Sequence, residues 1–166
     1  SGYIGRNLTE QFKNKYHILT PSSRQLDLLD SNKVEKFFKF HKIDVVIHTA
    51  VIGGSRKEEH ISDSFQKNMR MFINIARNKK YFKKFINLGS GAEYDKNKPL
   101  IKVKENNFDT HVPTDDYGYF KYCCSKYIEN KEDFINLRIF GLFGKFERYD
   151  LRFISNTICK YIFKIP

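Results

Sequence analysis

Three short apolar runs, separated by longer segments with helical patterns, restrict the folds open to this chain of 166 residues. The first, Asp44–His48, is apolar without alternation, which is typical of a parallel strand covered on both faces. Phe85–Leu88 and Phe134–Ile139 are the other two. Apolar residues recur at helical spacing in the intervals 31–42, 62–80 and 116–130. Strands that alternate with helices of this length predict an α/β fold with a parallel sheet and right-handed crossovers.

The rest of the chain adds shorter elements. Ile4, Leu8 and Phe12 have helical spacing and predict a helix at the start of the chain. Tyr16–Thr20 predicts a strand, and Ser31 is a plausible N-cap for the helix that follows it. Further expectations are a short extended piece at 26–30, a polar loop at 91–113 and a helix at 151–163.

Composition narrows the classes of function. The formal net charge is +11, but the lysines are scattered through the sequence, so we expect no dedicated nucleic-acid surface. No apolar run reaches the roughly 18 residues that a membrane span needs, and no signal peptide opens the chain, so we expect a cytoplasmic protein without membrane contact. Cysteines and histidines lack metal-ligand spacing, which predicts no metal site and free thiols at Cys123, Cys124 and Cys159.

A tyrosine and a lysine four residues apart on a helix share one face, and Tyr117 and Lys121 have this spacing. Ser90 comes just after the apolar run at 85–88 and can meet them at the carboxyl end of that strand. The three side chains together make a proton-donating set suited to carbonyl and alcohol redox chemistry. Spacing alone does not select this pair, because three others fit it: Tyr94/Lys98, Tyr122/Lys126 and Tyr127/Lys131.

Seven motifs occur along the chain in an order that resembles one family. They are SGYIG (1–5), LDLLD (26–30), VVIHTA (45–50), Asn68, LGSGAEY (88–94), YGYFK (117–121) and LRIFGLFG (137–144). In this order and spacing the chain resembles the extended short-chain dehydrogenase/reductase family, also called the NAD-dependent epimerases/dehydratases. Within it, the pattern is most similar to the GDP-fucose synthase-like nucleotide-sugar reductases. The resemblance implies a Rossmann-like, doubly wound parallel sheet with helices on both faces.

The resemblance also implies how the chain is organised. Residues 1–150 correspond to the NAD(P)-binding Rossmann domain without its first strand, and residues 151–166 correspond to the start of the substrate-binding domain. We therefore expect a part of a protein of about twice this size. Relatives in the family commonly dimerise through the helices equivalent to 62–80 and 116–130, so we expect a homodimer.

Of the four tyrosine–lysine pairs, the resemblance selects Tyr117, with Lys121 and Ser90 as its partners in catalysis. Tyr117 would exchange a proton with the substrate carbonyl oxygen, and Ser90 would orient that oxygen. Lys121 would lower the pKa of the tyrosine and hold the nicotinamide ribose. A purely structural tyrosine–lysine pair and an ordinary serine at a strand end are the alternatives.

A nicotinamide dinucleotide is the cofactor that the resemblance implies, with NADP preferred over NAD. The turn after the second strand carries Ser22, Ser23 and Arg24 and no acidic residue, which suits a 2′-phosphate. An ordinary exposed Arg24 is the alternative. The expected cofactor-binding residues are Gly2, Tyr3, Ile4, Gly5, Ser22, Ser23, Arg24, Asp27, Leu28, Thr49, Ala50, Val51, Leu88, Tyr117, Lys121, Ile139 and Leu142.

Departures from the family pattern narrow the reaction. Dehydratases of the family carry Asp-Glu after the catalytic residue, whereas Gly91 and Ala92 follow Ser90 here, so we expect no dehydration. Ala92 and the lack of any histidine after His111 remove the acid–base pair that GDP-fucose synthase uses to epimerise its substrate. The favoured function is reduction of a 4-keto group on a nucleotide-linked sugar. A C4 epimerase with retained NAD and a non-catalytic NADP-binding protein are the alternatives.

Overall fold

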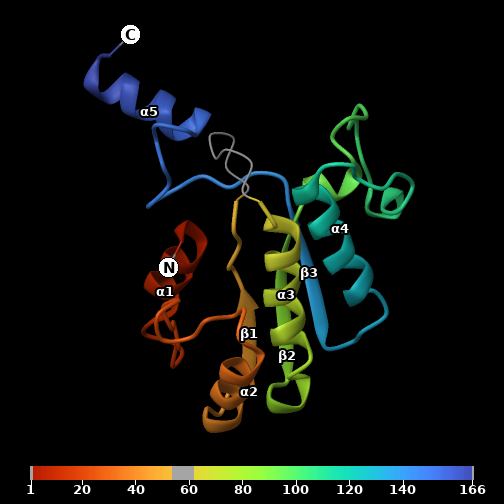
Figure 1. Ribbon diagram of the computed structural model, residues 1–166. Helices are drawn as coiled ribbons and strands as arrows, with labels where there is room; N and C mark the ends of the chain where they lie inside the picture. Colours follow the sequence, from red (N-terminus) through yellow and green to blue (C-terminus); the bar gives the residue numbers. More distant parts are fainter. Residues whose placement is uncertain (1, 54–61, 166) are drawn as a thin grey trace. The chain divides into compact units, whose positions relative to one another are not determined.

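A computed structural model describes residues 2–53 and 62–165 of the chain (Figure 1). The chain divides into two compact units, one of residues 22–140 and one made of residues up to 21 together with those from 141 onward. The larger unit contains α2 (Ser31–Phe40), β1 (Val45–His48), α3 (Ser64–Ala76), η1 (Lys79–Tyr81), β2 (Lys84–Ser90), η2 (Gly91–Tyr94), η3 (Glu105–Asn107), α4 (Asp116–Ile128) and β3 (Phe134–Ile139). The smaller unit contains α1 (Tyr3–Phe12) and α5 (Phe153–Phe163).

The three strands form one parallel sheet in the order β1-β2-β3. β2 lies in the centre, and its Asn87 is in register with His48 of β1 and Asn136 of β3. Ser90, the last residue of β2, is in register with Ile139. Because the strands run in the same direction, their carboxyl ends meet at one edge of the sheet. The predicted parallel α/β arrangement is confirmed, and β3 has the bounds that the sequence predicts.

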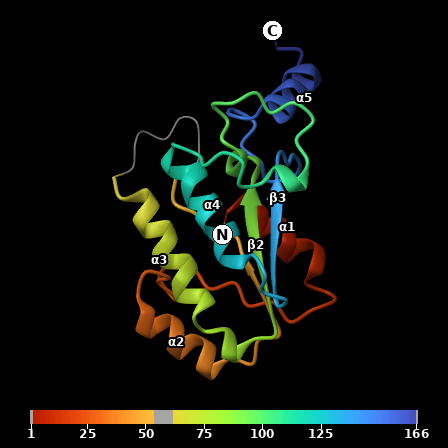
Figure 2. The same cartoon turned by 90° about the vertical axis from the view of Figure 1, so that its right-hand side faces the viewer.

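Helices α2, α3 and α4 cover one face of this sheet (Figure 2). Phe85 of β2 is fully buried at the centre of that face, against Phe72 of α3 and Phe134 of β3. Phe38 of α2 and Phe120 of α4 belong to the same core cluster. Full burial of one such side chain contributes about 1.5–3 kcal/mol. Aromatic packing on this face of the sheet therefore contributes to the stability of residues 22–140.

Strand β1 differs from the expectation that both of its faces are buried. Val46 and His48 face the helices, whereas Val45 is 49% exposed and Ile47 is 41% exposed. In the described part of residues 22–140, all three long helices lie on the face opposite Val45 and Ile47. A continuous apolar run identifies a strand of a parallel sheet, but the run does not reveal which of its faces is covered.

The N-terminal predictions need two further corrections. Residues 16–20 form a bend and an irregular segment, not a strand, because a strand requires ladder partners and none of the described strands pairs with them. Ser31, the predicted N-cap, is instead the first residue of helix α2, and Asp30 is the N-cap. The Asp30 carboxylate accepts hydrogen bonds from the backbone N–H groups of Asn32 and Lys33, both at 3.0 Å.

The short extended piece expected at 26–30 is a third correction, because this segment forms turns, in which the Asp27 carboxylate accepts a hydrogen bond from the Leu29 N–H at 2.9 Å. Later elements follow the predictions more closely. The predicted polar loop at 91–113 contains the short helices η2 and η3. Helix α4 begins at Asp116, and its N-cap Asp115 accepts a hydrogen bond from the Gly118 N–H at 3.0 Å.

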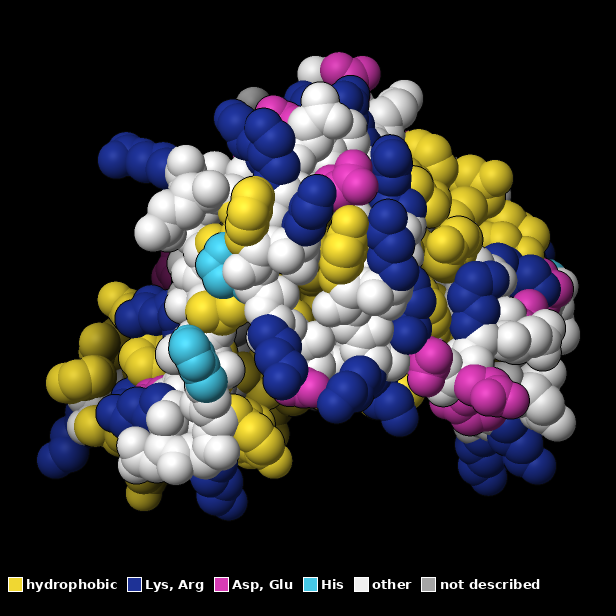
Figure 3. Space-filling view, turned by 90° about the horizontal axis from the view of Figure 1, so that it is seen from below, with side chains coloured by type: hydrophobic (Ala, Val, Ile, Leu, Met, Phe, Trp, Pro, Cys, Tyr) yellow, Lys and Arg dark blue, Asp and Glu magenta, His cyan; other side chains and the backbone are white. Residues whose placement is uncertain are grey.

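Surface properties agree with the scattered charge of the sequence. In the view of Figure 3, Lys and Arg side chains are interspersed with acidic and apolar side chains and form no single basic patch. Within residues 2–53 and 62–165, no helix combines the length and apolarity that crossing a membrane requires. The same residues contain no group of three His, Cys, Asp or Glu side chains placed to hold a metal ion.

Candidate active site

The carboxyl edge of the sheet carries several of the predicted site residues. Residues 49–51 follow β1, Ser90 ends β2, and Ile139 ends β3. The segment after β1 is held by the buried Asn68 of α3, which donates to the Ile52 carbonyl and accepts from the Ile52 N–H, each at 2.8 Å. These two hydrogen bonds fix the backbone at the carboxyl edge of the sheet, which is where open parallel sheets bind their ligands.

Ser90 occupies a defined position because it caps the short helix η2. Its Oγ accepts a hydrogen bond from the Ala92 N–H at 3.1 Å, and its own N–H donates to Glu93 Oε1 at 2.8 Å. This reciprocal pair is a capping box. The Ser90 hydroxyl accepts from the backbone, so its proton remains available to a partner.

Gly118 lets the start of α4 approach η2 closely. A Cβ atom at Gly118 would lie 2.9 Å from the Ala92 carbonyl oxygen and 2.9 Å from Pro113 Cβ. Real Cβ atoms essentially never approach so closely, so another residue at this position would push the helix away. The first turn of α4, which carries Tyr117, is therefore packed beside the turn that follows Ser90.

Lys121 is a charged residue with only 7% of its surface exposed. Its Nζ donates to the Leu88 carbonyl at 2.6 Å and lies 5.7 Å from the centroid of the Tyr117 ring. Burial lowers the pKa of Lys121, and the nearby Cys124 and Glu93 partly offset that effect. The structure thus brings Tyr117 and Lys121 close to Leu88, which precedes Ser90 by two residues in the chain.

The other tyrosine–lysine pairs lie in different surroundings. Tyr122 donates a hydrogen bond to the Asp109 carboxylate, which raises the pKa of Tyr122 to about 12. Tyr127 packs edge-on against Phe72 in the core. Tyr94 is buried and stacks on Phe140, and burial raises the pKa of Tyr94. The lysines of these pairs, Lys98, Lys126 and Lys131, are all exposed.

The remaining predicted cofactor residues divide between the two units. Gly2 is the N-cap of α1, whose first turn contains Tyr3, Ile4 and Gly5. That turn has neither an acidic residue nor a side-chain cap. Leu142 follows β3 in the same smaller unit. Ser22, Ser23, Arg24, Asp27 and Leu28 form turns before α2 in the larger unit.

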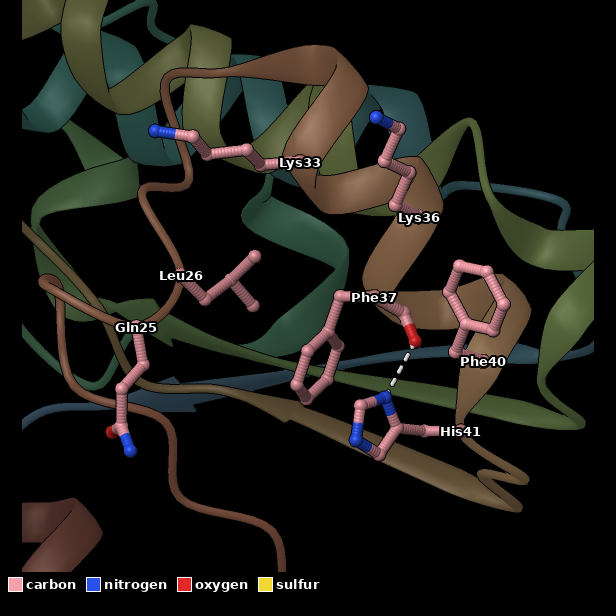
Figure 4. Close-up of a pocket in the computed structure, with 7 residues that line it drawn as sticks. All are labelled: Gln25, Leu26, Lys33, Lys36, Phe37, Phe40 and His41. Atoms are coloured by element: carbon pink, nitrogen blue, oxygen red, sulfur yellow. Dashed lines mark hydrogen bonds between the residues drawn. The ribbon is translucent and has the colours of Figure 1, made fainter.

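A pocket elsewhere in the larger unit contains none of the predicted residues. It lies between α2 and the turn before it (Figure 4), where the rings of Phe37 and His41 stack with centroids 4.2 Å apart. Its lining residues are Gln25, Leu26, Lys33, Lys36, Phe37, Phe40 and His41. This pocket is distinct from the carboxyl edge of the sheet, where the candidate residues gather.

The sequence analysis did not single out a polar cluster that surrounds the buried Glu93, whose carboxylate accepts a hydrogen bond from the Ser90 N–H. Its members are Glu93, Ser125, Asn136 and Arg138. Two signals in the sequence could have found it. Ser90 and Glu93 have the spacing of a capping box, and Asn136 and Arg138 put polar side chains at alternate positions on one face of an otherwise apolar strand.

Comparison with known proteins identifies the class of protein. The model of the NAD dependent epimerase/dehydratase family matches residues 1–164, and the chain belongs to that family. The predicted family, the Rossmann-like α/β fold and the assignment to a class of NAD(P)-dependent enzymes are thereby confirmed at the level of the family.

The individual relatives share less than a third of their aligned residues with this chain. The chain is 29% identical over 177 residues to a GDP-L-colitose synthase of Yersinia pseudotuberculosis, covering 97% of this chain and 58% of the relative. A GDP-mannoheptose C4 reductase from Campylobacter jejuni with NADP bound has a TM-score of 0.80 at 24% identity, covering 97% of this chain and 52% of that one. A GDP-L-fucose synthetase from Naegleria fowleri bound to NADP has a TM-score of 0.70 at 20% identity, covering 96% and 58%. The chain therefore spans about half the length of these relatives, and the two structural likenesses establish the fold.

Proposed function

We propose that this protein is an NADP-dependent reductase that acts on a 4-keto group of a nucleotide-linked sugar. The observation that carries the proposal is the buried Lys121 ammonium beside the Tyr117 ring, on a helix packed against the turn that follows Ser90. The names of the relatives, a C4 reductase and two GDP-sugar synthases, support the same chemistry and substrate class.

Each of the three side chains has a distinct part in the proposed reaction. The cofactor supplies a hydride when it is bound. Tyr117 donates its phenolic proton to the carbonyl oxygen, and the nearby positive charge of Lys121 favours the phenolate that remains. Ser90 donates its hydroxyl proton in a hydrogen bond to the same oxygen, since its Oγ already accepts from the Ala92 N–H.

The residues present fit a nicotinamide dinucleotide. An ammonium has three donors, and the Leu88 carbonyl takes one of those of Lys121, which leaves donors for ribose hydroxyls. The uncapped first turn of α1 offers backbone N–H groups of the kind that bind phosphates. No hydrogen bond or ion pair among the described residues engages Arg24, so its guanidinium is available to a 2′-phosphate.

Titration of the full-length protein with NADPH and NADH, with and without a 4-keto nucleotide sugar, tests the proposal. We expect tighter binding of NADPH and oxidation of one NADPH for each sugar reduced. Turnover without added cofactor would instead support the C4 epimerase with retained NAD. Binding of NADPH without any turnover would support the non-catalytic alternative, and binding of neither dinucleotide would contradict all three.

We also propose a cytoplasmic homodimer that pairs through α3 and α4. These helices lie side by side, with the rings of Phe65 and Tyr119 stacked at 5.3 Å. Ile73 of α3 and Tyr119 of α4 leave apolar surface exposed. Sedimentation of the full-length protein tests the dimer, and a monomer at micromolar concentration would contradict it.

The boundary at residue 150 between a cofactor domain and a substrate domain stays a prediction.

A further inference from the structure

Glu93 of η2 is fully buried and carries a charge, a combination that is costly unless every oxygen lone pair is satisfied. Its Oε1 accepts a hydrogen bond from the Ser90 N–H at 2.8 Å. Its Oε2 accepts from Ser125 Oγ at 2.5 Å and from Arg138 Nε at 2.8 Å. The Arg138 guanidinium supplies the opposite charge, so the buried carboxylate is both paired and hydrogen-bonded.

The surrounding residues leave room for this carboxylate and complete its contacts. A Cβ atom at Gly89 would lie 2.3 Å from Glu93 Oε1, so glycine is needed where β2 passes the carboxylate. Asn136 Nδ2 donates to both carboxylate oxygens at 3.2 and 3.3 Å, and its Oδ1 accepts from Asn87 Nδ2 at 2.7 Å. The cluster therefore links β2, β3, η2 and α4 through one side chain.

The partners of Glu93 include both halves of the candidate active site. On one side it holds the backbone of Ser90. On the other it holds Ser125, which lies one turn after Lys121 and two turns after Tyr117, on the same face of α4. We propose that Glu93 is a positioning residue, which sets Ser90 at a fixed place relative to Tyr117 and Lys121. For its effect on turnover, this inference rests on the proposed reductase function.

If Glu93 only stabilised the fold, its substitution would lower activity by the same factor whether or not Ser90 is present. A double-mutant cycle separates the two roles. If Glu93 acts by placing Ser90, then Glu93→Gln costs activity only while Ser90 is present. Glu105 provides a matched control, since it pairs with the same arginine at 2.8 Å but its side chain is 84% exposed. Among the described residues, no hydrogen bond or ion pair joins Glu105 to Ser90 or α4.

The experiment measures kcat and KM of the full-length enzyme with NADPH and a 4-keto nucleotide sugar. Glu93→Gln and Glu105→Gln are each compared in the wild-type and Ser90→Ala backgrounds. We expect Glu93→Gln to lower kcat by about 10- to 100-fold, with the KM for NADPH nearly unchanged, and to cost nothing further beside Ser90→Ala. Glu105→Gln keeps the wild-type kcat. An unchanged kcat for Glu93→Gln, or an equal loss in both backgrounds, would overturn the proposal.

A second measurement does not depend on turnover. Hydrogen exchange of the Ser90 amide should become faster in Glu93→Gln and stay unchanged in Glu105→Gln. If the wild-type enzyme reduces no 4-keto nucleotide sugar, the proposed function fails, and this measurement alone decides whether Glu93 holds Ser90. If Glu93→Gln does not fold, Ser125→Ala replaces it, because it cuts the link to α4 and keeps the Arg138 pair. Additive losses of Ser125→Ala and Ser90→Ala would then overturn the inference.

Discussion

At the scale of single residues, the surroundings of Tyr117 separate it from the other tyrosines. We expect Tyr117→Phe to lower kcat by about 10²- to 10⁴-fold, the usual contribution of a positioned general acid. Tyr122→Phe is the matched control on the same helix, because the Tyr122 hydroxyl donates its hydrogen bond to Asp109, which is not one of the candidate site residues. Steady-state kinetics of the two variants check this prediction. Full activity in Tyr117→Phe would refute the assigned proton donor.

The buried His48 side chain should make the stability of the protein depend on pH. Its Nε2 has no hydrogen-bond partner among the described residues, and burial, together with the charge of Lys121, lowers the pKa of His48 to about 3. An unfolded histidine has a pKa of about 6.5. As pH falls below 6.5 the unfolded state binds a proton and the folded state does not, so stability is present above 6.5 and decreases toward pH 3.

The expected loss is about 2 kcal/mol of unfolding free energy between pH 7 and pH 5. His48→Gln should remove this slope, whatever its effect on absolute stability, because glutamine does not titrate. Exposed His111 provides the control, and His111→Gln should keep the slope. Urea denaturation at the two pH values measures the difference. Equal slopes in wild-type protein and His48→Gln would contradict the burial of a neutral histidine.

Sequence and structure contribute differently at this scale. Helical spacing leaves four tyrosine–lysine pairs, and the resemblance to the family selects Tyr117 and Lys121 from them. Ser90 is a candidate because it follows an apolar strand. The catalytic roles of these three residues stay predictions. The sequence analysis missed Glu93 because its partners Ser125 and Arg138 are more than 30 residues away in the chain. Only the packing of α4 and β3 around η2 shows that the carboxylate is buried and paired.

At the scale of elements, the position of α4 depends on Gly118. Alanine would favour the helix by up to ~1 kcal/mol, but its Cβ would collide with the Ala92 carbonyl at 2.9 Å. Overpacking of this kind costs about 1–3 kcal/mol. We therefore expect Gly118→Ala to be destabilising and to lower activity, because the adjacent Tyr117 moves with the helix. Gly141→Ala is the control, since nothing lies within 4 Å of its added Cβ.

Chemical denaturation measures the stability of both glycine variants. A Gly118→Ala protein as stable and active as wild type would show that α4 does not need this close contact with η2. Unchanged stability in Gly141→Ala, beside a loss in Gly118→Ala, would assign the effect to that contact and not to backbone entropy alone.

Element boundaries show where sequence patterns suffice. β3 has the predicted bounds because Phe134–Ile139 is apolar at both ends and pairs along its whole length with β2. Residues 16–20 have an equally good strand pattern but form none, because a strand is completed by its neighbours. Asp30 and Ser31 are both good N-cap residues, so sequence preference alone could not decide between them.

At the scale of the whole molecule, the choice of cofactor is predicted to depend on Arg24. We expect Arg24→Ala to weaken NADPH binding by about 10- to 100-fold, the value of a lost charge-assisted hydrogen bond, and to leave NADH binding unchanged. Exposed Arg77 at the end of α3 provides the control, because it lies toward the opposite edge of the sheet. Fluorescence titration of both dinucleotides checks this, and an equal loss for NADPH and NADH would contradict a contact with the 2′-phosphate.

The central claim is hydride transfer from NADPH to the 4-keto carbon of a nucleotide-linked sugar, with Tyr117 as the proton donor. The most direct measurement follows deuterium from the transferable position of labelled NADPH into the sugar by mass spectrometry and NMR. The proposal predicts one deuterium on C4 of each sugar for each NADPH oxidised, and almost none with Tyr117→Phe. A product without deuterium, formed while NADPH remains reduced, would contradict the claim and leave internal hydride return by a retained NAD as the mechanism.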